Sequence, residues 1–144
     1  MGKKRIVKKA GGSVDAGRKS RSLSRVPKKK LESGILHVKA TYNNTGVLLT
    51  DKSGKAVMSS SSGALGFKGA KKGTPFAAAK VGELIGEKAS MMGVKDVNVV
   101  IKGVGAGRES SIRAFATKGV QISSIKDITP VPHNGPRPPK PRRV

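Results

Sequence analysis

The sequence predicts an α/β fold, a mixed sheet of about five strands with flanking helices, between extended basic N- and C-terminal tails. Three short strand-like runs between residues 35 and 59 are separated by tight turns, a pattern typical of an antiparallel meander. Apolar residues then recur at helical spacing between residues 74 and 92. A strand, a second helical segment and a last strand-like segment follow, and this alternation indicates a mixed sheet.

The meander is built from strand-like runs at residues 35–42, 47–50 and 55–59. In the first run Leu36, Val38, Ala40 and Tyr42 alternate with other residues, so we expect all four on one face of the sheet. Asn, Gly, Asp and Ser dominate the two connections, and these residue types favour turns.

The first helix is expected to begin at Thr74, with Pro75 at its first helical position and Gly93 at its end. Residues 97–101 are apolar enough to form a strand that is buried on both faces. The remaining elements expected are a helix through residues 112–116 that ends at Gly119 and a weaker strand within residues 120–128.

The two tails differ from this central domain, expected over residues 34–129, in composition. Residues 1–30 hold 12 of the 30 Lys and Arg residues and one acid. Because such a segment buries too little apolar surface to offset its ordering entropy, residues 1–33 are expected to be disordered, although an organelle transit peptide has a similar composition. Proline and cations dominate residues 130–144, which predicts an extended arm; a Pro-rich signalling ligand is the alternative.

The charge of the chain indicates its class of partner. The formal net charge is +22 over 144 residues, with 30 Lys and Arg against eight Asp and Glu. Since self-repulsion of this size weakens a compact state, the composition predicts a polyanionic partner, most commonly nucleic acid. There is no cysteine and no apolar stretch long enough to span a membrane, so we expect a cytoplasmic protein; the cations also do not form one amphipathic helix for a membrane surface.

Two glycine-rich loops are candidate phosphate-binding sites, because exposed backbone N–H groups and a following helix N-terminus both attract phosphate. Residues 63–74 carry Lys68, Lys71 and Lys72, and an ordinary solvated loop is the alternative. Residues 103–109 carry Arg108, which would bind phosphate through two N–H groups unless this is simply a close-packed turn. Neither loop has the spacing of a nucleoside triphosphate or dinucleotide motif.

No constellation of residues predicts an active site, a metal site, a cofactor or a small-molecule substrate. The acids are dispersed, and Glu83 and Glu87 fit a solvated helix face better than a metal pair. His37 is expected to be a surface or packing residue. Because exposed aromatic pairs are absent, recognition is expected to use phosphates, 2′-hydroxyls and the shape of folded RNA rather than base stacking.

From about Gly34 to Val144 the chain resembles the bacterial form of the universal small-subunit ribosomal protein eleven, the S11 family. The motifs that carry the resemblance occur at residues 40–45 (ATYNNT), 66–69 (GFKG), 74–78 (TPFAA), 107–110 (GRES), 127–135 (DITPVPHNG) and in the RPPK and RRV ending. One departure is that Val104 and Ala106 stand where the family usually has prolines in the second glycine-rich loop.

This resemblance implies a ribonuclease H-like fold without the nuclease carboxylates, and a structural, non-enzymatic place on the platform of the small subunit. It implies contact with small-subunit ribosomal RNA near the messenger RNA exit path, and ribosomal proteins seven and eighteen as neighbours. Glu109 is expected to hold Arg108 or to cap its helix. The implied RNA-binding residues are Asn43, Asn44, Thr45, Lys68, Arg108, His133, Asn134, Arg137, Lys140, Arg142 and Arg143, to which charge alone adds Lys71 and Lys72.

Two other functions remain open from the residues alone. A general RNA- or DNA-binding architectural or chaperone protein would bind nucleic acid weakly and without preference for one fold. A nuclease would need clustered carboxylates and a divalent metal, which the dispersed acids do not favour.

Overall fold

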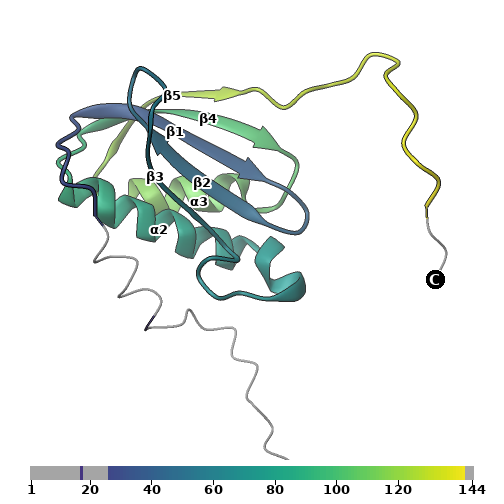
Figure 1. Ribbon diagram of the computed structural model, residues 1–144, viewed down its shortest axis with the longest axis horizontal. Helices are drawn as coiled ribbons and strands as arrows, with labels where there is room; N and C mark the ends of the chain where they lie inside the picture. The colour runs from purple at the N-terminus through teal and green to yellow at the C-terminus, as the bar shows by residue number, and fades with distance from the viewer. Residues whose placement is uncertain (1–16, 18–25, 142–144) are drawn as a thin grey trace, which may run out of the picture.

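A five-stranded mixed sheet in the order β3-β2-β1-β4-β5 organises the computed structural model, which describes Gly17 and residues 26–141 (Figure 1). In chain order the elements are β1 (Ser33–Ala40), β2 (Thr45–Thr50), β3 (Ala56–Ser61), the 3-10 helix η1 (Gly69–Gly73), α2 (Pro75–Met91), β4 (Asp96–Gly103), α3 (Gly107–Ala116) and β5 (Gln121–Asp127). The predicted α/β class is therefore confirmed.

The strand pairings follow from the connections between them. β1, β2 and β3 pair antiparallel through short turns, with Val38 opposite Val47 and Leu49 opposite Met58. β4 lies parallel to β1, and β5 lies parallel to β4, because a helix connects each strand to the next. All three parallel strands therefore end at the same edge of the sheet.

Both helices cover the same face of the sheet, and the core lies between them (Figure 1). The sheet contributes alternate residues such as Leu36 and Val99, and the helices contribute side chains such as Leu84 and Phe115, all fully buried. α2 and α3 pack closely because Gly82 has no side chain: a Cβ there would overlap the backbone of α3.

Two expectations about burial were wrong. Tyr42 does not share the buried face with Ala40, because β1 ends at Ala40 and the Tyr42 side chain is 78% exposed in the following loop. β4 is not buried on both faces, since Val97 and Val99 are buried but Asn98 and Lys102 are exposed. With both helices on one face, the other face of the sheet is left open to solvent.

The signals at the start of the first helix were correct. The Thr74 side chain accepts a hydrogen bond from the Ala77 amide at 3.3 Å, and Pro75 occupies the first helical position. α2 ends at Met91, and Gly93 shortly after it lies in the left-handed region at φ 82°.

The described parts of the two tails differ in their contacts. Leu31 is buried in the core, and the Lys29 ammonium lies 3.3 Å from the Asp51 carboxylate. Residues 1–16 and 18–25 of the expected N-terminal extension lie outside the described residues. Residues 130–141 form an arm that contains neither helix nor strand and runs away from the sheet (Figure 1).

Candidate nucleic-acid interface

Three loops converge at the edge of the sheet where β1 and β4 end. The connection from β1 to β2, residues 41–44, lies beside the β4–α3 loop, and the Gly105 amide donates to the Ala40 carbonyl at 3.1 Å. A Cβ on Gly105 would overlap the Thr41 carbonyl, so only glycine allows this approach. The β4–α3 loop is thus a close-packed turn, which was the alternative to a phosphate-binding loop.

The connection between β1 and β2 also contacts the segment before α2. Its backbone is held by the Thr41 amide, which donates to the Asn44 carbonyl at 2.8 Å. A side chain on Gly73 would overlap the Tyr42 carbonyl, which places the end of η1 directly against this turn. The N-termini of α2 and α3 therefore flank residues 41–44 from two sides.

The loop between β3 and α2 is anchored rather than loosely solvated. Leu65 and Phe67 are buried, and the Phe67 ring meets the Phe76 ring edge-on with centroids 6.1 Å apart. Lys68 and Lys71, by contrast, are exposed, and Lys71 lies in the last turn of η1. Two apolar anchors thus hold a cationic segment at a fixed place on the surface.

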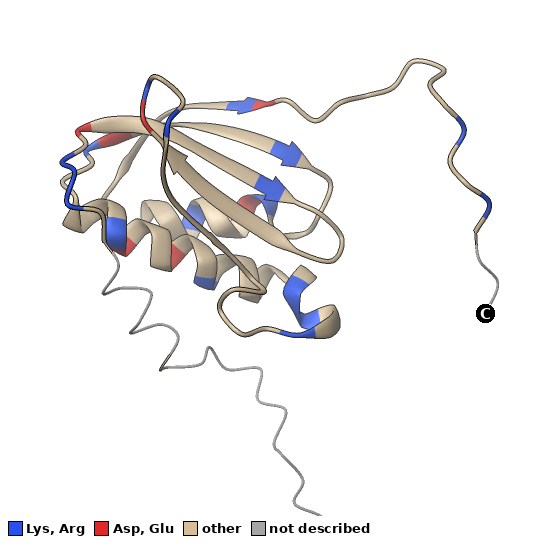
Figure 2. Cartoon of the chain, viewed as in Figure 1, with Lys and Arg blue, Asp and Glu red and all other residues tan. Residues whose placement is uncertain are grey.

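Further cations lie on the neighbouring strand ends. Lys39 of β1 and Lys102 of β4 are direct register partners, and both are exposed. Figure 2 shows cationic segments at the ends of these two strands, on η1 and along the arm. Lys39 and Lys102 are not among the residues predicted from the sequence, because their adjacency depends on the parallel pairing of strands about 60 residues apart. Their position at the ends of two predicted strands is the signal that could have identified them.

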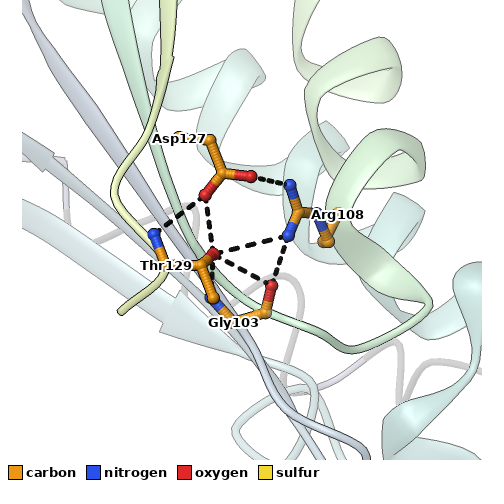
Figure 3. A network of polar contacts seen from close by, with 4 residues as sticks. All are labelled: Gly103, Arg108, Asp127 and Thr129. Carbon is orange, nitrogen blue, oxygen red and sulfur yellow. Dashed lines mark hydrogen bonds and ion pairs between the residues drawn. The ribbon is translucent and has the colours of Figure 1, made fainter. Parts of the chain in front are cut away.

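Arg108 is engaged within the protein (Figure 3). Its guanidinium donates to the Gly103 carbonyl at 2.5 Å, to the Thr129 hydroxyl and to the Asp127 carboxylate. The Thr129 hydroxyl and amide donate to Asp127, and with Arg108 they lower the pKa of this carboxyl to about 2. Arg108 is held by Asp127 and not by Glu109, which lies exposed in the first turn of α3.

The asparagines and threonine of the β1–β2 turn have different environments. Asn43 is exposed, whereas Thr45 is fully buried and packs against Gly107 at the start of α3. Asn44 Oδ1, Thr45 Oγ1 and Ser110 Oγ are buried without a hydrogen-bond partner among the described residues. An unsatisfied buried polar atom costs about 1–3 kcal/mol, so this edge carries a local cost in stability.

The remaining predicted site residues lie on the arm. His133, Asn134, Arg137 and Lys140 are all exposed, and Asn134 adopts the left-handed conformation with φ 55°. They are not gathered with the three loops. Arg142 and Arg143 lie outside the described residues.

Glu83 and Glu87, which were weighed as a possible metal pair, each form an ion pair with a lysine. Glu83 contacts Lys80 at 3.0 Å, and Glu87 contacts Lys118 at 3.1 Å. Within residues 26–141 no group of three or more His, Asp or Glu is placed to hold a metal ion. No helix in the described part of the chain combines the length and apolar character needed to cross a membrane.

A comparison with known families gives a match over most of the chain. Residues 34–143 match the family described as ribosomal protein S11. The match covers the sheet except for Ser33, both helices and the described arm. The chain therefore belongs to the ribosomal protein S11 family, and it is a non-enzymatic structural constituent of the small ribosomal subunit that binds ribosomal RNA.

Proposed function

We propose that the loop edge of the sheet is the surface with which the domain binds folded small-subunit ribosomal RNA. The observation that carries the proposal is the convergence of three loops and two helix N-termini where β1 and β4 end, with the exposed Lys68 and Lys71 beside them. Helix N-termini and lysines both attract phosphate, and a fixed arrangement of such groups selects RNA by the spacing of its backbone.

The arm provides a second, separate contact in this proposal. Its described cations, Arg137 and Lys140, stand among prolines on an extended chain. A proline-stiffened segment loses less entropy on docking than a flexible one, which suits a segment that enters between RNA helices. Asn43, His133 and Asn134 are exposed and available for 2′-hydroxyl and phosphate contacts.

The family resemblance supports a finer placement, on the platform near the messenger RNA exit path with ribosomal proteins seven and eighteen as neighbours. In that setting the loop edge faces ribosomal RNA, and the protein helps to shape the exit and decoding region during translation. Chemical cross-linking of intact small subunits, followed by mass spectrometry, tests the neighbours directly.

The RNA surface is tested by replacing three lysines at the loop edge. The triple variant Lys68→Gln, Lys71→Gln, Lys72→Gln is compared with wild type for binding to a small-subunit ribosomal RNA transcript over a range of salt concentrations. If each lysine contacts one phosphate, the slope of log affinity against log salt falls by about three.

A control variant makes the same change in charge at the opposite end of the sheet. Lys52, Lys55 and Lys95 are exposed there, and their triple replacement by Gln is expected to alter the slope by less than about one. Equal loss in both variants would contradict a defined surface. Equal affinity of wild type for a scrambled transcript of the same length would favour the general architectural or chaperone alternative.

A further inference from the structure

A shallow groove with a volume of about 680 Å³ crosses the open face of the sheet, on the side away from the two helices. It begins at Ala64 and the serines of β3, passes over β2, β1 and β4, and ends at Ile128. It therefore runs across the strands and beside the loop edge, and it includes none of the three converging loops described above, residues 41–44, 103–107 and 66–74.

The groove exists because small side chains occupy its middle. Gly46 of β2 lies between its register partners Lys39 of β1 and Ser61 of β3. A Cβ on Gly46 would meet a single atom within 4 Å, the Ser60 carbonyl oxygen at 4.0 Å. The space above Gly46 is thus open, and no backbone requirement explains the glycine, since its φ is not positive.

The lining combines an apolar floor with positive charge. Leu48 and Val100 form the floor beside His37, and Ile128 closes one end with 45% of its surface exposed. Lys39 and Lys102 lie on the wall nearest the loop edge, and no Asp or Glu lines the groove. An occupant must therefore bury apolar groups and bring negative charge to the two lysines.

We propose that this groove docks an extended segment of a partner protein that carries apolar side chains with a neighbouring Asp or Glu. The apolar side chains fill the hollow above Gly46, and the carboxylate pairs with Lys39 and Lys102. Apolar anchors within a charged rim are the usual composition of such a docking site.

Charge excludes the occupants that this chain itself could supply. A second copy carries a formal charge of +22, and both the N-terminal residues and the arm are cationic, so all three are repelled by the two lysines. RNA is disfavoured for another reason: the floor offers aliphatic groups rather than aromatic rings for base stacking, and the sugar–phosphate chain would lie over apolar surface.

The test places a photo-cross-linker on the groove in assembled small subunits. Ser59 lines the groove and is exposed, so Ser59→p-benzoylphenylalanine is incorporated into small subunits, irradiated and analysed by mass spectrometry. We expect a cross-link to a protein segment with apolar residues and an acid adjacent to them. A cross-link to ribosomal RNA, to a basic segment or to nothing overturns the proposal. None of these outcomes bears on RNA binding by the loop edge, which the lysine variants test separately.

Substitutions that fill the groove, or that reverse a charge in it, are compared by their effect on the Ser59 cross-link. Gly46→Ile places a side chain in open space on a strand, where it is compatible with the fold, and it is expected to lower the Ser59 cross-link at least about fivefold. Lys102→Glu is expected to do the same through charge, and Lys95→Glu, at the other end of the sheet, is the control with no effect. An undiminished cross-link in both groove variants overturns the proposal.

Discussion

Arg108, in the first turn of α3, is bound to Asp127 at the end of β5. The same guanidinium donates to the Gly103 carbonyl, so one side chain connects the end of β4, the start of α3 and the root of the arm (Figure 3). A charge-assisted contact of this kind fixes geometry as well as adding stability. Arg108 therefore ties the root of the arm to α3 and to the end of β4.

Replacement of Asp127 by Asn is expected to loosen the root of the arm. The change removes the charged partner of Arg108 and weakens the contacts that hold Thr129, whose hydroxyl accepts from the Gly103 amide at 3.1 Å. Hydrogen exchange of the Gly103 amide should become about tenfold faster, which corresponds to a loss of about 1.4 kcal/mol in local stability. Glu109→Gln, which removes an exposed charge beside Arg108, should leave this exchange unchanged.

Gly107→Ala is expected to destabilise the protein by about 1–3 kcal/mol through overpacking. A methyl group at this position would overlap Thr45 Oγ1 and would lie 2.6 Å from the Ala78 Cβ. Urea unfolding of the variant measures the loss. Gly46→Ala adds the same methyl group in open space and should change the free energy of unfolding by less than about 0.5 kcal/mol; equal losses in the two variants would show that the packing at Gly107 is not the cause.

Asp51 is expected to make stability depend on pH in the acid range. Hydrogen bonds from the Ser53 hydroxyl and the Lys55 amide, with a smaller contribution from Lys29, lower its pKa from 3.8 to about 2. Because the pKa is lower in the folded state, the contribution is complete above about pH 4 and is lost as the pH falls towards 2. Urea unfolding of wild type and Asp51→Asn should differ at pH 6 and converge near pH 2. A constant difference across this range would contradict the assignment.

Lys88→Met is expected to stabilise the free protein. Lys88 on α2 is only 6% exposed, and burial lowers the pKa of its ammonium group below 10.5 because the charged form is desolvated. Methionine retains most of the length of the side chain without the charge, so the melting temperature should rise. The folded state of the wild type releases its proton first, so its stability should increase relative to Lys88→Met as the pH rises towards 10.5. A lower melting temperature for Lys88→Met would show that the ammonium is well solvated.

The elements that depend on local sequence could be predicted, and those that depend on distant pairing could not. Thr74 and Pro75 correctly predicted the start of α2, because helix capping depends only on residues within the first turn of the helix. The burial of β4 was misjudged, because residues 97–101 do not reveal that α2 and α3 cover the same face.

The candidate site followed the same division. The loop composition predicts a cationic site at Lys68, Lys71 and Lys72. Lys68 and Lys71 are exposed, and Lys72 is partly exposed. The internal engagement of Arg108 could not be foreseen, because its partner Asp127 is 19 residues away and reaches it through the parallel pairing of β5 with β4. Thr45 was selected with its neighbours, yet the alternation of β2 turns it inward.

The arm also determines how far from its sheet the protein can make contacts. Residues 130–141 bend at His133 and Asn134, and their contour length is about 37 Å at about 3.1 Å per residue. That is more than the length of β1, so a chain of 144 residues can touch RNA segments that lie farther apart than its own sheet is long. The contacts of Arg108 with Asp127 and Thr129 hold the point from which the arm extends, so the conformation of residues 130–141 sets the distance between the loop edge and the cations of the arm.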